Sequence, residues 1–265
     1  MQVLSKYRCI FCESAQKLSR EHIYADWLKD YIEKTESHTF HLTTFMGGAP
    51  VRGKLYRPGD AHSQRLRVVC SSCNNGWMSR LQEKAKPLLV PLIKDEWPVL
   101  NKDTQATIAS WIVMTTMVVE FANPETAAIP QKQRTHFMAN QKTPPDWSIW
   151  IGRQDPEGQH PAYFNHFGRR LLSGLPHHLT AHHIQMTTFT IGRFFFKSVT
   201  ITPPIKGKNI NHDAFSRGYD IRTIEPFIGD IDGRPITAHD RKSRQIVAND
   251  GAHELGFRNI QIFPS

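Results

Sequence analysis

Hydrophobic positions repeat at helical spacing in two long stretches of the chain. Trp77, Leu81 and Leu88–Leu89 lie on one side of a helix that we expect to begin at residue 74 and to break near Pro87–Pro91. Residues 105–122 are almost continuously apolar, and Thr104 is placed to cap their start. Polar residues interrupt this second stretch, and it is too short to span a bilayer. We therefore predict a buried helix that ends before Pro124 and no membrane segment.

Other stretches show the alternation or the apolar runs of β-strands. They comprise residues 39–45, 55–56, 66–69, 147–151, 186–191 and 194–201, with turns expected at Pro58-Gly59-Asp60 and Gly192-Arg193. Gly192-Arg193 separates two apolar runs and therefore predicts a β-hairpin. A short helical face around Trp27 and Tyr31 completes the N-terminal part. Helical and strand signals together predict an α+β protein.

The length and the type of the expected elements change near residue 100. Short elements punctuated by cysteines precede this point, whereas the long apolar helix and the longer strand signals follow it. We expect two parts, residues 1–100 and residues 101–265, the second a mixed helix and antiparallel-strand domain of unknown role.

The charge of the chain favours an anionic partner. There are 33 Lys and Arg residues against 24 Asp and Glu, a formal net charge of +9. Basic side chains gain affinity for nucleic acids by releasing counterions from phosphates, so we expect a nucleic-acid partner and favour DNA. Both parts are only mildly basic, and a generally basic protein would show the same balance. The arginines near the second cysteine pair, Arg65, Arg67 and Arg80, are the candidate phosphate contacts, and the alternative is that they are solvated charges without a function.

The cysteines form two pairs of identical spacing, Cys9/Cys12 and Cys70/Cys73, and the chain contains four cysteines in total. Two such pairs supply a closed tetrahedral zinc site, which is structural because no coordination position stays open. The first residues lack the apolar core of a signal peptide, so we expect a reducing cytoplasm with zinc rather than disulfides.

A carboxylate, an imidazole and an amide accompany the cysteine pairs. Glu21-His22 lies between the pairs, and Asn74 directly follows Cys73. Glu21 and Asn74 offer the sparse oxygen ligands that Mg²⁺ takes when a substrate phosphate supplies the others, and neutral His22 is able to accept a proton from water. Asn75 is the alternative to Asn74 as a ligand.

The order Cys-x-x-Cys, Leu-Ser-x-Glu-His-Ile, Cys-x-x-Cys-Asn over residues 6–90 resembles the HNH (ββα-metal, His-Me finger) endonucleases, in particular the zinc-bearing branch that includes recombination endonuclease VII. The resemblance implies a zinc-stabilised ββα-metal domain. It also implies His22 as general base, Glu21 and Asn74 as ligands of a catalytic Mg²⁺ or Mn²⁺, and DNA as substrate. Two positions depart from the family pattern. Gln64, Arg65 and Arg67 occupy the region of its middle Asn, and Glu21 replaces the commoner Asp.

Two readings from other classes compete with the nuclease. One is a zinc ribbon that binds DNA without cleaving it, and the other is an interaction protein with a vestigial HNH core. The sequence leaves open whether the substrate is duplex, branched, nicked or RNA. It also leaves open the oligomeric state, a homodimer included, and a role in phage defence, restriction or mobile elements.

Overall fold

The fold was analysed in a computed structural model of the 265-residue chain. The structure describes residues 8–32, 39–40, 43–46, 49–52, 57–58, 61–122, 124, 127–155, 162–169, 184–202, 220–235 and 238–239. Helices and largely antiparallel sheets are both present, so the α+β prediction is confirmed.

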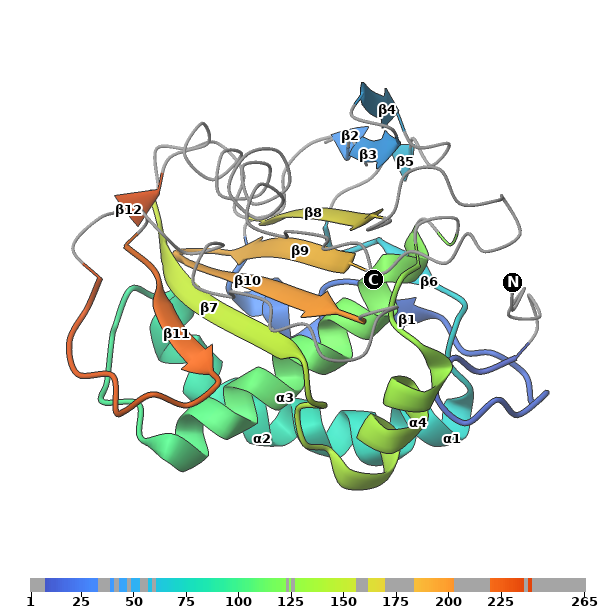
Figure 1. The fold of residues 1–265 in the computed structure, drawn as a ribbon, viewed down its shortest axis with the longest axis horizontal. Helices are drawn as coiled ribbons and strands as arrows, with labels where there is room; N and C mark the ends of the chain where they lie inside the picture. Colours follow the sequence, from blue (N-terminus) through green and yellow to red (C-terminus); the bar gives the residue numbers. More distant parts are fainter. Residues whose placement is uncertain are drawn as a thin grey trace, which may run out of the picture.

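A six-stranded sheet forms one layer of the molecule (Figure 1). Its strand order is β11-β7-β10-β9-β8, and β12 pairs with β7 in parallel while every other pairing is antiparallel. The strands are β7 (Trp147–Gln154), β8 (Ala162–Arg169), β9 (Ile184–Ile191), β10 (Phe194–Ile201), β11 (Arg222–Glu225) and β12 (Ala238–His239). The hairpin predicted around Gly192-Arg193 is confirmed as β9–β10.

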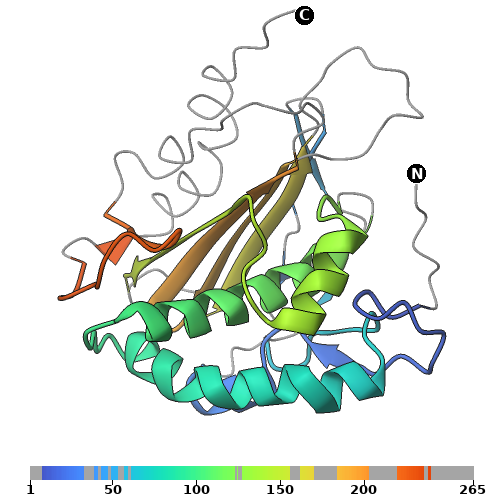
Figure 2. The same cartoon turned by 60° about the horizontal axis from the view of Figure 1, so that its bottom comes forward.

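Helices α3 (Lys102–Val119) and α4 (Gln131–Asn140) lie against this sheet, and α2 (Ser79–Ile93) packs on the far side of α3 (Figures 1 and 2). α3 is buried between the sheet and α2, which explains why its sequence is apolar on all sides. The short helix η3 (Glu120–Ala122) extends α3, and the two together are long and apolar enough to cross a membrane. However, 83% of their most apolar stretch is buried inside the protein.

Two helix boundaries differ from the sequence prediction. Asn101, not Thr104, caps α3, because its Oδ1 accepts a hydrogen bond of 3.0 Å from the Thr104 backbone N–H. α2 continues through Pro87 and Pro91 instead of breaking there. Pro87 is exposed and Pro91 half-buried, so water is able to bind the carbonyls that the prolines leave without donors, while Leu81, Ala85 and Leu89 hold the other side in the core.

The N-terminal part consists of short elements around the cysteine pairs. β1 (Glu21–His22) pairs antiparallel with β6 (Arg65–Leu66), and η1 (Asp26–Asp30) follows β1. Two further pairs are β2 (Thr39–Phe40) with β5 (Arg57–Pro58), and β3 (Thr43–Met46) with β4 (Ala49–Arg52). The predicted strand at 55–56 and residues 59–60 of the predicted turn lie outside the described residues, and the strand predicted at 66–69 is shorter than expected.

The helical segment after β6 is continuous from the second cysteine pair onward. It comprises α1 (Ser71–Cys73), the π-helical turn η2 (Asn74–Met78) and α2, with a kink at Gly76. Two antiparallel strands followed by a helix are thus the elements that carry the candidate site.

The hydrophobic core crosses the proposed division of the chain at residue 100. One cluster contains Phe11 and Trp77 from the first part and Phe137 and Phe196 from the second. The Trp77 ring makes edge contacts with the Phe11 ring at 4.9 Å and the Phe137 ring at 5.7 Å between centroids. The division into residues 1–100 and 101–265 stays a prediction, and the two parts share this core.

Candidate functional site

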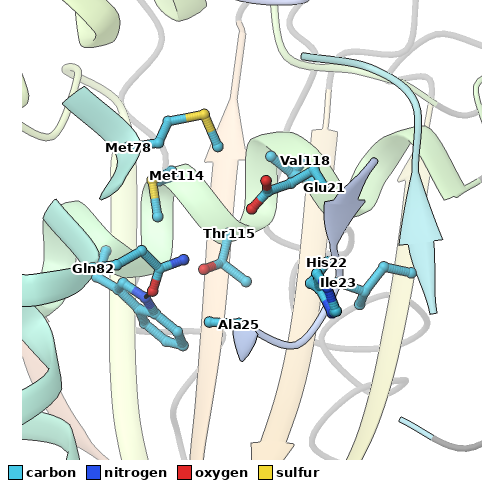
Figure 3. A pocket seen from close by; sticks show the side chains of 10 residues that line it. Glu21, His22, Ile23, Ala25, Met78, Gln82, Met114, Thr115 and Val118 are labelled. Atoms are coloured by element: carbon cyan, nitrogen blue, oxygen red, sulfur yellow. Dashed lines mark hydrogen bonds between the residues drawn. The ribbon is translucent and has the colours of Figure 1, made fainter. Parts of the chain in front are cut away.

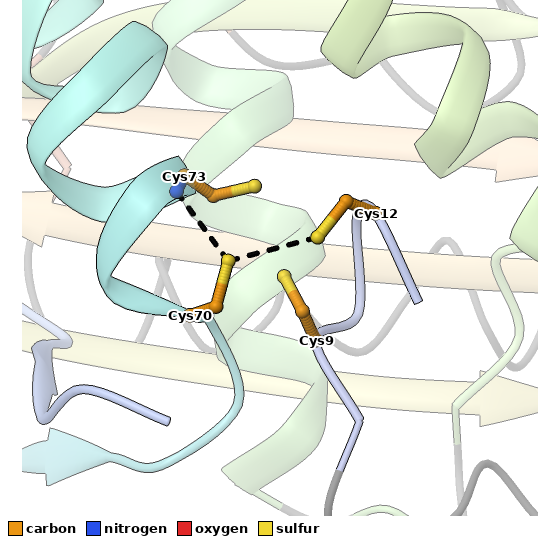
Figure 4. Close-up of side chains that lie close together, drawn as sticks. All are labelled: Cys9, Cys12, Cys70 and Cys73. Atoms are coloured by element: carbon orange, nitrogen blue, oxygen red, sulfur yellow. Dashed lines mark hydrogen bonds between the residues drawn. The ribbon is translucent and has the colours of Figure 1, made fainter. Parts of the chain in front are cut away.

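The four cysteines come together at the start of the helical segment (Figure 4). Their sulfur atoms all lie within 4.8 Å of one another, and Cys12 Sγ is 3.6 Å from Cys70 Sγ. A tetrahedral site with Zn–S bonds of about 2.3 Å separates its sulfurs by about 3.8 Å, so this cluster has the size that zinc requires. All four cysteines are free thiols, which agrees with a metal site rather than with disulfides.

The surroundings of the cluster also suit a structural metal. The Cys73 backbone N–H donates to Cys70 Sγ at 3.5 Å, and an isolated bridge joins Leu18 to Cys70. Burial raises the pKa of Cys9 and Cys73, so these thiols keep their protons at neutral pH unless a cation stabilises the thiolates. The cluster is compatible with structural zinc binding, and the cysteines are the residues that would hold the ion.

α4 covers the first cysteine pair from the C-terminal part of the chain. Gln131 Nε2 donates to the backbone oxygen of Ile10 at 3.0 Å, and Thr135 Oγ1 donates to that of Phe11 at 3.4 Å. The region of the cysteine cluster is therefore supported by a helix more than a hundred residues further along the chain, a contact that the sequence does not reveal.

Glu21 and Asn74 lie side by side at the junction of β1 with the helical segment. Glu21 is 8% exposed, and burial raises the pKa of its carboxyl to about 7, although a hydrogen bond with the Asn74 side chain lowers it in part. Asn74 Nδ2 also donates to Ser19 Oγ at 3.1 Å, which leaves Asn74 Oδ1 as an acceptor. Asn75, the alternative ligand, is exposed. The structure therefore brings Asn74, rather than Asn75, to Glu21.

His22 occupies the next position of β1 and turns toward the other face of the strand. Its Nε2 atom is 3.5 Å from Asp26 Oδ1, and His22 lies opposite Arg65 in the register of the strand pair. Burial and the Arg65 charge lower the pKa of His22, against the opposing effect of Asp26. Neutral imidazole, the form that accepts a proton, therefore predominates at neutral pH.

A small pocket connects β1 to helices α2 and α3. Figure 3 shows the Glu21 carboxylate and the Gln82 amide pointing toward its middle, with Thr115 between them. Gln82 Oε1 accepts hydrogen bonds from Trp111 Nε1 at 2.7 Å and Trp27 Nε1 at 3.1 Å, which fixes the orientation of this amide. The pocket gives Glu21 a partly apolar environment, which is the physical reason for its raised pKa.

The three arginines expected near the site lie on two different elements. Arg65 and Arg67 are exposed on and beside β6, and Arg80 is exposed on α2. Sequence reasoning missed Arg20, Asp26, Ser19 and Gln82. The two-residue spacing of Arg20 and His22 would have placed both side chains on the same side of a strand. No local pattern points to Gln82, because its partners come from distant segments.

Among the described residues, the four cysteines are the single group of three or more His, Cys, Asp or Glu side chains placed to hold a metal ion. Glu21 and Asn74 contribute two oxygen ligands at most. Comparisons of the chain with protein-family models, with curated proteins and with solved structures found no match.

Proposed function

We propose that the N-terminal part is an HNH-type nuclease domain that hydrolyses DNA phosphodiester bonds with a divalent metal. One observation supports this above all. The Glu21 carboxyl and the Asn74 amide, distant in the sequence, are neighbours where an antiparallel strand pair meets a helix, and His22 is the next residue along the strand. β1, β6 and the helical segment also occur in the order strand, strand, helix that a ββα-metal domain has, although η1 and β2 to β5 lie between the two strands, and the cysteine cluster lies at the helix start.

Each residue has a distinct role in this proposal. Glu21 and Asn74 Oδ1 would hold Mg²⁺ or Mn²⁺, which would neutralise charge on the phosphate and on the departing 3′-oxygen. His22 accepts a proton from the attacking water, whose oxygen forms the new bond to phosphorus as the bond to the 3′-oxygen breaks. The products carry a 5′-phosphate and a 3′-hydroxyl.

The cysteine cluster has a structural role in the same proposal. Ser19, which accepts from Asn74, also donates to the Val69 backbone oxygen at 3.0 Å, one residue before Cys70. Zinc at the cluster would hold β1 and the helix start together, and so would keep Glu21 and Asn74 in place. We propose the cytoplasm as the location, because four zinc-binding thiols require a reducing compartment.

Plasmid cleavage with and without Mg²⁺ or Mn²⁺ tests the proposal. His22→Ala is expected to lower the rate by roughly 10² to 10⁴-fold without changing DNA affinity, because it removes the proton acceptor alone. Asn74→Ala is expected to lower activity that high metal concentration partly restores, and Asn75→Ala is the matched control that stays active. Zinc-loaded protein that binds DNA but cleaves none under any metal condition would instead identify a DNA-binding zinc ribbon.

A further inference from the structure

Four basic or titratable side chains share one face of the β1–β6 strand pair. Glu21 and Leu66 are buried, whereas Arg20, Arg65 and Arg67 are exposed and His22 is half-buried. Successive residues of a strand point to opposite faces, so Arg20 and His22 lie on the solvent face of β1, and Arg65 and Arg67 lie on that of β6. We call Arg20, Arg65 and Arg67 the arginine strip.

The strip concentrates positive charge in an unfavourable way for the isolated protein. His22 lies directly opposite Arg65, and Arg20 and Arg67 extend the two strands at the same end of the pair. Like charges on neighbouring strands destabilise a sheet. Within the described part of the chain, neither Arg20 nor Arg67 makes a hydrogen bond or an ion pair, whereas the Asp26 carboxylate partly offsets the charge at Arg65.

The strip leads from His22 toward the cysteine cluster. Ser19 N–H donates to the Val69 backbone oxygen at 2.8 Å, and Leu18 bridges to Cys70 just beyond. Residues two apart on a strand are about 7 Å apart, so Arg20 and Arg67 lie one such step from His22 and Arg65. Arginine binds phosphate oxygens through a planar fork of donors, which suits two guanidinium groups that face a single phosphodiester.

We propose that Arg20 and Arg67 together bind the nucleic-acid phosphate next to the reacting one, and that the substrate backbone runs along β1–β6 toward the cysteine cluster. This inference rests on the proposed function, since His22 marks the reacting position. It adds Arg20 to the binding surface and makes the strand pair, rather than the α2 face that carries Arg80, the main electrostatic contact.

The test is equilibrium binding of the full-length, zinc-loaded protein to a labelled duplex DNA and to an RNA of the same sequence, in Ca²⁺ and at salt concentrations of roughly 50 to 200 mM. Arg20→Ala and Arg67→Ala are each expected to weaken binding by roughly three- to tenfold and to lower the salt slope by about 0.9, and the double variant by about twice that slope. Arg80→Ala is expected to lose less affinity than either of these variants, and Lys142→Ala, at an exposed position after α4, is the matched control that should bind like the wild type. Arg20→Lys is expected to keep the salt slope but to bind less tightly, because lysine lacks the planar fork.

Binding by Arg20→Ala and Arg67→Ala that equals the wild type, or an equal loss in Arg80→Ala, would overturn the inference. Zinc content and circular dichroism of each variant identify a folding defect. If an alanine variant does not fold, the binding of Arg20→Lys is compared with that of the wild type instead. Plasmid cleavage provides a separate outcome. Strip-dependent binding without metal-dependent cleavage would support the strip as a phosphate-binding surface but would refute the nuclease, and with it the assignment of the strip to the phosphate next to the reacting one. The DNA and RNA arms show which backbone the strip prefers.

Discussion

Replacing Glu21 by glutamine is expected to stabilise the protein at alkaline pH while it abolishes metal-dependent activity. Burial raises the pKa of the Glu21 carboxyl from 4.5 to about 7. The folded state therefore binds a proton more tightly than the unfolded state does, and stability falls as the pH rises from about 4.5 to about 7. A shift of this size corresponds to about 3 kcal/mol of unfolding free energy, lost once the buried carboxyl is ionised.

Glu21→Gln removes this loss, because glutamine has nearly the same shape, keeps an oxygen that accepts from Asn74, and carries no charge. In zinc-loaded, magnesium-free protein at pH 8, we expect Glu21→Gln to be more stable than the wild type by up to about 3 kcal/mol. At pH 5 the two should differ little. Urea unfolding followed by tryptophan fluorescence measures both values, and Glu83→Gln, at an exposed position of α2, is the matched control that should show no such pH-dependent difference.

Magnesium should cancel most of this stability difference. Binding to the folded state alone adds about 2.7 kcal/mol at a hundredfold excess over the dissociation constant, and this gain belongs to the wild type, which retains the carboxylate ligand. A Glu21→Gln protein that is less stable than the wild type at pH 8 without magnesium would refute the reasoning. That result would mean that the surroundings of Glu21 stabilise its ionised carboxylate and that burial of this carboxylate does not lower the stability of the protein.

Three further predictions concern the scaffold. Zinc content should be near one ion per chain, and Cys9→Ser or Cys73→Ser should unfold or precipitate the protein, whereas a soluble, fully folded, zinc-free wild type would exclude the structural site. Arg134→Met should cost about 3 to 5 kcal/mol in urea unfolding, because it leaves the buried carboxylate of Glu120 without its ion-pair partner, while exposed Lys132→Met on the same helix should be nearly neutral. Gly192→Ala should cost about 1 to 3 kcal/mol, since φ is +55° there and a Cβ would lie 2.8 Å from Ile93 Cγ2. Gly233→Ala, at φ +89° with open space around it, should show the backbone strain alone.

Local patterns determined a good part of the fold. The hairpin β9–β10 was predictable because Gly192-Arg193 separates two apolar runs, and Gly192 does adopt a left-handed φ of +55°. The buried helix α3 was predictable because its apolar residues surround the whole helix axis. The cysteine cluster was predictable because two Cys-x-x-Cys pairs have the spacing that is typical of the ligands of a zinc site. The hairpin and the helix were inferred from residues close together in the sequence, whereas the cysteine cluster was inferred from two pairs that share one spacing although they lie far apart in the sequence.

Contacts between distant segments decided the rest. α2 continues through Pro87 and Pro91 because burial of its other side against α3 outweighs the lost backbone hydrogen bonds. The residues around the two prolines do not reveal this packing against α3. The sequence named Glu21, His22 and Asn74 as candidates, but only the folded chain places Asn74 rather than Asn75 beside Glu21 and encloses that carboxyl in a pocket formed by α2 and α3. Burial depends on what packs over a residue, so the raised pKa of Glu21 and the shared face of the arginine strip are properties of the tertiary structure alone.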